Sequence, residues 1–202
     1  MKQLVIEVPR LASMRVAGNP PSFTSACEMP YLVKASLTHP VGDHGLLWSL
    51  RDARRLDLIG FSATALLDGE PDDDDDFPMF HNLRALLLDW CELGRVGCRV
   101  LHRFLQNAPR LETLTLLHCA VSSDDYYCSR SAKRVKTSAG DRHEPAAAPY
   151  PCENLWYVEV QFYDDHTVVE LAKVLGHISK EMARPIEGSV LDGKRTVKIW
   201  YA

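Results

Sequence analysis

Apolar and polar positions alternate with the same spacing in two stretches of the central chain. Leu83-x-x-Leu86-x-Leu88-x-x-Cys91 is followed, 28 residues on, by Leu111-x-x-Leu114-x-Leu116-x-x-Cys119. Alternate side chains of a strand point to opposite faces, so Leu86 and Leu88 are expected on one face. Between the copies, residues 96–106 carry apolar side chains at helical spacing. The pattern therefore predicts a strand followed by a helix, occurring at least twice.

The same template fits four more places, so that it occurs six times in all. The additional matches are Leu11-x-x-Met14-x-Val16, Leu32-x-x-Ala35-x-Leu37, Ala53-x-x-Leu56-x-Leu58-x-x-Phe61 and Leu155-x-x-Val158-x-Val160-x-x-Tyr163. Short apolar runs also occur as core strands of any α/β protein. Six matches to one template instead favour a leucine-rich repeat, whose period is about 20–29 residues.

The expected fold is therefore an α/β leucine-rich-repeat solenoid. Its curved parallel sheet should have about six to seven strands, with helices or irregular segments on the convex side. A final strand, 196–200, is expected to close the series.

The segments between the strands favour short helices. Residues 44–52 allow no more than two helical turns, and 96–106 should end at Asn107 and Pro109. A longer helix is expected after Asp164 or Asp165. Its buried side would carry Val168, Leu171, Leu175 and Ile178, and Gly188 and Gly193 should mark the turn into the final strand.

Two polar stretches interrupt the repeats without dividing the chain. One contains Glu70-Pro71 and five aspartates, and the other is rich in Ala and Pro. Neither has the periodicity of a packed element, so both are expected to be surface loops. The organisation predicted is one domain, 1–202, comprising irregular N-terminal repeats 1–60, an acidic loop 68–78, core repeats 80–119, a flexible insertion 120–151, and a C-terminal repeat, helix and strand 152–202.

Composition and charge are those of an ordinary globular protein. Hydrophobic residues make up 46% and charged residues 25%, and the net charge is −4. No apolar run is long enough for a membrane span or a secretory signal. The six cysteines contain no Cys-x-x-Cys pair. We therefore expect reduced thiols, no membrane partner, and a cytoplasmic or nuclear location.

Residues that could support chemistry favour a non-enzymatic protein. The run Asp72–Asp76 could attract a divalent cation, but it lacks the glycine turn and distal glutamate of a calcium loop. The eight histidines form no His-Glu-x-x-His motif and no cysteine–histidine metal spacing. His118 adjoins Cys119, yet no third group of a catalytic triad can be named. No enzyme activity, metal or cofactor is expected.

The surface of the sheet is then the candidate functional site, because solenoid strands line an extended concave face. The residues that flank the buried positions are charged at both ends and apolar in the middle, as at many protein-binding surfaces. An alternative is that the apolar ones only contact inserted loops. The predicted partner-binding face consists of Arg55, Asp57, Ile59, Ala85, Leu87, Asp89, Thr113, Thr115, Leu117, Tyr157, Glu159 and Gln161.

The central repeats also carry a family resemblance. Residues 80–91 and 104–119, with 29–37 and 152–160 on either side, resemble the leucine-rich-repeat region of plant F-box/LRR proteins. In that family the repeats select a protein substrate, and an N-terminal F-box docks onto the Skp–cullin ubiquitin ligase. No segment resembling an F-box precedes Leu11. The resemblance therefore implies a protein-binding scaffold, and Skp–cullin partners only if an F-box exists upstream.

Three further expectations stay open at this stage. The chain could be the substrate receptor of an SCF-type ubiquitin ligase whose F-box lies outside it. The basic stretch 130–142 could contact nucleic acid, and within it Lys133–Lys136 could be a nuclear localisation signal. A repeat array without a cap exposes its first strand, so Leu4, Ile6 and Val8 are expected on an uncapped edge strand that promotes aggregation.

Overall fold

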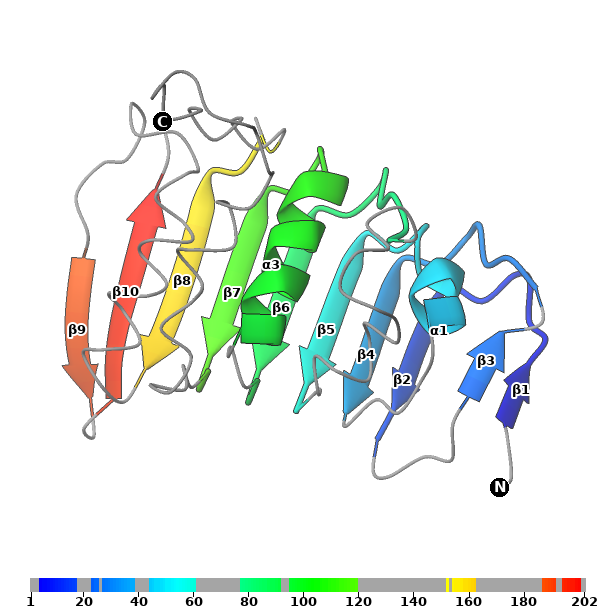
Figure 1. Ribbon diagram of the computed structural model, residues 1–202, viewed down its shortest axis with the longest axis horizontal. Coiled ribbons are helices and arrows are strands. Elements are labelled where there is room, and N and C mark those ends of the chain that lie inside the picture. The colour runs from blue at the N-terminus through cyan, green and yellow to red at the C-terminus, as the bar shows by residue number, and fades with distance from the viewer. Residues whose placement is uncertain are drawn as a thin grey trace, which may run out of the picture.

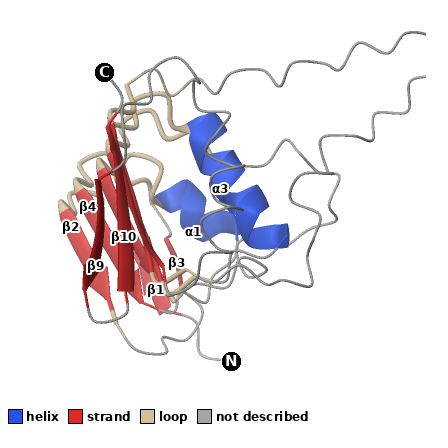
Figure 2. Ribbon diagram, turned by 90° about the vertical axis from the view of Figure 1, so that its left-hand side faces the viewer, coloured by secondary structure: helices blue, strands red, loops and turns tan. Residues whose placement is uncertain are grey.

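The computed structural model describes residues 4–17, 23–25, 27–38, 44–60, 77–91, 95–119, 152, 154–162, 187–191 and 194–200. Within these ranges the chain is a mixed α/β structure. One large, mostly parallel sheet has two helices on a single face (Figures 1 and 2). In spatial order its eight strands are β2 (Ser13–Val16), β4 (Lys34–Thr38), β5 (Arg55–Ile59), β6 (Ala85–Asp89), β7 (Thr113–Leu117), β8 (Tyr157–Phe162), β10 (Lys194–Trp200) and β9 (Glu187–Leu191).

The six template matches are the six neighbouring parallel strands β2 to β8. Each pairs with the next at equivalent template positions, so that Leu56, Leu86, Leu114 and Val158 form one continuous row. The row beside it contains Leu37, Leu58, Leu88 and Leu116 on β4 to β7. All these side chains are buried. The predicted inward positions and the predicted strand register are thus confirmed.

The turn before each strand is also repeated. The first residue of the template donates its backbone N–H to the carbonyl three residues earlier, as Leu83 does to Phe80 and Leu111 to Ala108. The acceptor residue is buried in every repeat from β4 to β8, where it is Met29, Leu50, Phe80, Ala108 and Cys152 in turn. These acceptor residues therefore form a further buried row, next to the leucine rows, which connects the sheet to the helix layer.

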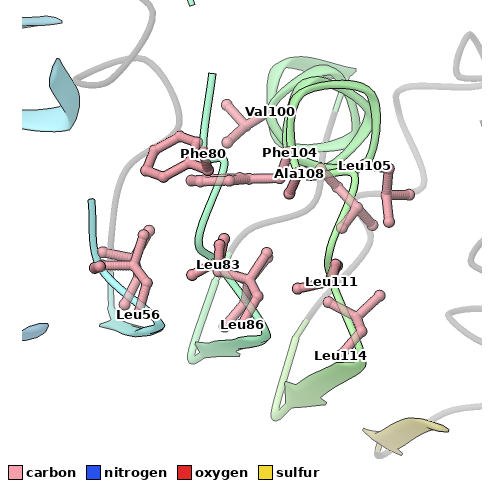
Figure 3. Close-up of a cluster of buried hydrophobic side chains, with 14 of the residues drawn as sticks. Leu56, Phe80, Leu83, Leu86, Val100, Phe104, Leu105, Ala108, Leu111 and Leu114 are labelled. Atoms are coloured by element: carbon pink, nitrogen blue, oxygen red, sulfur yellow. The ribbon is translucent and has the colours of Figure 1, made fainter. Parts of the chain in front are cut away.

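Two helices lie on the face formed by these buried rows, α1 (His44–Ser49) and α3 (Arg95–Asn107). α3 directs Leu101, Phe104 and Leu105 into the core, where Phe104 contacts Phe80 at a ring separation of 5.3 Å (Figure 3). The helix ends at Asn107, whose side chain donates to the carbonyl of Arg103. The two expected short helices are confirmed.

The carboxyl-terminal end of the sheet differs from the expectation. β10 was predicted to continue the parallel series, but it runs antiparallel to β8. The segment around Gly188 was predicted to be a turn, but it is strand β9, antiparallel to β10. The expected turn residue Gly193 lies outside the described residues, and only two residues separate β9 from β10. Two adjacent antiparallel strands need only such a short connection, whereas a parallel pair needs a crossover.

The amino-terminal end also differs. β1 (Leu4–Ile6) lies outside the large sheet, because it pairs in parallel with β3 (Phe23–Ser25) to form a separate two-stranded sheet. Ile6 is half-buried against the core, whereas Val8 is exposed. The edge of the large sheet at this end is β2. An edge strand is therefore found at Leu4 and Ile6 as expected, but it belongs to this small sheet and has β3 as a partner on one side.

The interrupting segments fall largely outside the described residues. This applies to the acidic loop apart from Phe77 and Pro78, to the insertion 120–151 and to the expected helix from Val168 to Ile178. The boundaries proposed for the single domain stay predictions.

Candidate functional site: the open face of the sheet

The side chains predicted to bind a partner share one face of the sheet. Both described helices lie on the opposite face (Figure 2), and we call the helix-free side the open face. On β6, β7 and β8 the buried and half-exposed residues alternate without a break. Ala85, Leu87 and Asp89 on β6 are half-exposed, while Leu86 and Leu88 between them are buried. The predicted set therefore points away from the helix layer.

Strand register aligns the set into rows that cross the strands. One row, from β4 to β8, contains Lys34, Arg55, Ala85, Thr113 and Tyr157. The next contains Ser36, Asp57, Leu87, Thr115 and Glu159 and continues through Lys198 on β10 to Glu187 on β9. In the third, Ile59 on β5 pairs with Asp89, and Asp89 pairs with Leu117. Gln161 lies further along on β8 and accepts a backbone hydrogen bond from His118.

Asp57 departs from the expected exposed charge. Its side chain is only 9% exposed and forms ion pairs with Lys34 at 3.3 Å and with Arg55 at 2.9 Å. Both cations lie on the same face, one on the neighbouring strand and one two residues earlier on β5. Because the two longer side chains fold over the short carboxylate, Asp57 is covered while the cations remain about half exposed. The surface at this point is therefore positive.

The residues just before the strands form a rim along the amino-terminal edge of the sheet. The backbone carbonyl of each rim residue accepts a hydrogen bond from the N–H of the rim residue in the next repeat. The rim residues are, in order, Ala12, Val33, Arg54, Arg84, Glu112 and Trp156, the last of which only donates. Arg84 and Glu112 also form an ion pair at 2.8 Å. Arg54 is exposed and forms no ion pair with another described residue. The expected binding set omitted this rim, whose only sequence signal is its position before each template strand.

The opposite edge holds another group that sequence reasoning missed. Gly60, Trp90 and His118 each follow a strand, and each has a positive φ of 51–60°. Their backbone N–H groups donate to the carbonyls of Asp89, Leu117 and Gln161 respectively. The available signal was the template itself, because all three residues occupy the position just before its final small or aromatic residue.

Asp89, Trp90 and His118 are in contact at this edge. The imidazole Nδ1 of His118 lies 2.8 Å from Oδ1 of Asp89, and its ring stacks on Trp90 with centroids 4.8 Å apart. Trp90 is 59% exposed. His118 was considered beside Cys119, but the Cys119 thiol is buried and donates to the carbonyl of Leu117. The histidine and the thiol thus have separate partners.

Tyr157 and Glu159 make the last defined contact on the face. The phenol donates to Oε2 of Glu159 at 3.0 Å. Burial, followed by this hydrogen bond and the negative charge of Glu159, raises the pKa of Tyr157 to about 12. Trp156, half exposed on the rim, contacts the Tyr157 ring at 5.7 Å. Two aromatic side chains at this end are therefore flanked by carboxylates.

Other candidate sites lie outside the described residues. These are the aspartate run 72–76 and the basic stretch 130–142, including Lys133–Lys136. Among the residues that are described, no three His, Cys, Asp or Glu side chains gather as a metal site. Nor does any helix in this part of the chain have the length and hydrophobicity to cross a membrane.

Comparison with known proteins gives one match. The chain is 38% identical over 117 residues to the "MEIOTIC F-BOX protein MOF" of Oryza sativa subsp. japonica. The match covers 57% of this chain, and the chain spans 23% of the length of the rice protein. No protein-family model matches, and neither does any solved structure at a significant level. The similarity relates part of this chain to part of an F-box protein.

Proposed function

We propose that the chain is a leucine-rich-repeat module that binds a protein partner through the open face of its sheet. The observation that carries this proposal is the open face itself, on which twelve predicted residues share one side opposite the described helices. Leu87, Ile59 and Leu117 each pair in register with one aspartate, and apolar residues beside polar ones are common in protein interfaces. The rice relative is an F-box protein, which supports a role in protein interaction.

The repeat geometry supports the leucine-rich-repeat assignment. Six strands of one template pair in order, and each adds one apolar residue to each of the two rows that cross the sheet. In such arrays each repeat contacts mainly the repeats beside it, and together the repeats offer an extended binding surface. In this proposal the protein is non-enzymatic and acts in the cytoplasm or nucleus, and the face supplies recognition only.

A second candidate function is that of a substrate receptor in an SCF-type ubiquitin ligase. The specific observation in its favour is the F-box relative, of which this chain matches a part. In this case the open face would hold the substrate, and Skp–cullin contacts would be made by a segment outside the described sheet. Co-precipitation of the Skp subunit of the ligase with the protein expressed in plant cells tests this candidate, and its consistent absence would refute it.

Affinity capture with a tagged chain tests the interaction function. Leu87→Asp places a charge at the centre of the open face, next to Thr115 and Asp57 in register. We expect this variant to lose a partner that the wild-type chain captures, because a buried uncompensated carboxylate disfavours a complex.

Met79→Asp is the matched control. Met79 is also partly exposed, at 40%, but it adjoins Phe80, whose backbone contacts the end of α3 in the helix layer. We expect this variant to retain the partner. Circular dichroism must show that both variants fold. Equal capture by wild type and Leu87→Asp would refute the open-face assignment.

A further inference from the structure

The two ends of the open face differ in charge. Around the amino-terminal ends of β2, β4, β5 and β6 most of the charged side chains are cationic, and we call these cations the basic corner. Its members are Arg15, Lys34, Arg54, Arg55 and Arg84. Two neighbouring carboxylates, Asp57 and Glu112, form ion pairs with members of the group and neutralise only part of its positive charge. The corner is therefore positive on a chain whose net charge is −4.

We propose that the basic corner binds an extended acidic segment of a partner protein, with aspartate or glutamate carboxylates as the recognised groups. This inference rests on the proposed function and specifies the chemistry of the partner. The charge complementarity is local, because the side chains of Lys34, Arg55 and Arg84 are 45–57% exposed and retain donors that face solvent. Guanidinium groups bind carboxylates through two parallel hydrogen bonds.

The dimensions of the corner suit a short peptide segment. Neighbouring strands are about 4.8 Å apart, so the four strands from β2 to β6 span roughly 14 Å. An extended peptide covers about 3.3 Å per residue. About four to five residues of an extended segment therefore cross the corner, and alternate side chains of that segment would face it.

The distribution of carboxylates favours a protein segment over a nucleic acid. Single-stranded nucleic acid needs stacking aromatics beside a continuous positive groove. One exposed aromatic, Tyr31, precedes β4 near the corner, and a single ring does not form a stacking series. The contacting pair Trp156 and Tyr157 is separated from the basic corner by Glu112 and accompanied by Glu159. Both carboxylates would repel a phosphate backbone that reached the aromatic rings. An acidic peptide needs only the corner and does not approach these groups.

Arg54 and Arg84 give the sharpest test, because both lie on the rim and neither is part of the buried core. The double variant Arg54→Glu/Arg84→Glu reverses two charges on adjacent strands. Lys198→Glu is the matched control, since it reverses a charge on the same face but on β10, four strands from β5. Circular dichroism and thermal melting verify that each variant is folded.

The probe is a fluorescent peptide of alternating Asp and Ser residues, with binding followed by anisotropy. We expect saturable binding to the wild-type chain that weakens with added salt. The double variant should bind about tenfold more weakly, and Lys198→Glu as tightly as wild type. The proposal is overturned if an Asn/Ser peptide binds equally well, if the double variant binds normally, or if single-stranded oligothymidylate of equal charge binds more tightly.

The capture experiment with Leu87→Asp separates the two proposals. A partner that is lost with Leu87→Asp but retained by a folded Arg54→Glu/Arg84→Glu chain contradicts the acidic-segment inference and leaves the interaction function standing. A partner retained by both variants contradicts both proposals. Loss with both variants, together with peptide binding by the wild type, supports both.

Discussion

Leu86 and Leu87 are adjacent residues of one strand that lie on opposite faces of the sheet. Leu86 is 1% exposed and pairs in register with Leu56 and Leu114, both also buried. Leu87 is half-exposed on the open face. Leu86→Ala and Leu87→Ala therefore make the same chemical change in two different environments, and each is the control for the other.

The expected costs follow from burial. Removing a buried leucine side chain destabilises a protein by about 2–5 kcal/mol, because the transfer energy is lost and a cavity remains. We expect about 3 kcal/mol for Leu86→Ala and below about 1 kcal/mol for Leu87→Ala. For a chain of this length, 1 kcal/mol changes the melting temperature by about 2–4 °C. The melting temperature should therefore fall by roughly 6–12 °C for Leu86→Ala, and by no more than roughly 4 °C for Leu87→Ala.

Urea unfolding followed by far-ultraviolet circular dichroism measures both variants. With a denaturant slope of about 2 kcal/mol per molar, Leu86→Ala should lower the midpoint by about 1.5 M. A register shift of one residue would exchange the two faces and reverse the order of the two variants. Equal effects, or a larger loss for Leu87→Ala, would refute the strand register and with it the open face.

Three further outcomes concern ionisable groups. Asp57→Asn should destabilise the fold by about 1 kcal/mol, because it leaves the cations around it, including Lys34, without their carboxylate. The difference in urea midpoint should shrink at high salt, and a salt-independent loss would contradict the ion-pair explanation. The folded pKa of Tyr157 is raised, so its contribution to stability is complete below pH 10 and is lost as the pH rises towards about 12. Glu159→Gln should lower that pKa, as ultraviolet titration against a Tyr157→Phe reference would show. Burial raises the pKa of Cys152 to about 12, so its thiol should resist alkylation until urea unfolds the chain, and rapid native labelling would argue against its burial.

The repeated part of the fold was predictable because its signal is local. The spacing of Leu83, Leu86 and Leu88 determines which side chains enter the core, and five other segments share it. Parallel pairing in register then follows once one repeat stacks on the next. The same spacing also identified the residues that point away from the core. Because successive side chains of a strand point to opposite faces, the residues of the candidate face were largely predictable.

The unpredicted features depend on contacts between segments distant in sequence. Whether β10 runs parallel or antiparallel to β8 is determined by the length and path of the chain between them, which the spacing of apolar residues does not reveal. The burial of Asp57 depends on Lys34, 23 residues earlier, and on the covering reach of Arg55. Hydrophobic patterning assigns Asp57 to the outer face correctly but cannot predict how exposed it is.

The residue after each central strand shows why the repeat constrains the backbone more strongly than the side chain. A positive φ directs the N–H of Gly60, Trp90 and His118 to a carbonyl of the next strand, and the same hydrogen bond is made three times. Glycine adopts this conformation readily, whereas other residues pay about 1–2 kcal/mol. At Trp90 and His118 the ring stacking and the contact with Asp89 offset part of that cost. Pairing between repeats therefore fixes the backbone at this position, whereas the type of side chain can vary from repeat to repeat. In the β6 repeat that side chain is the exposed Trp90, at the edge of the sheet.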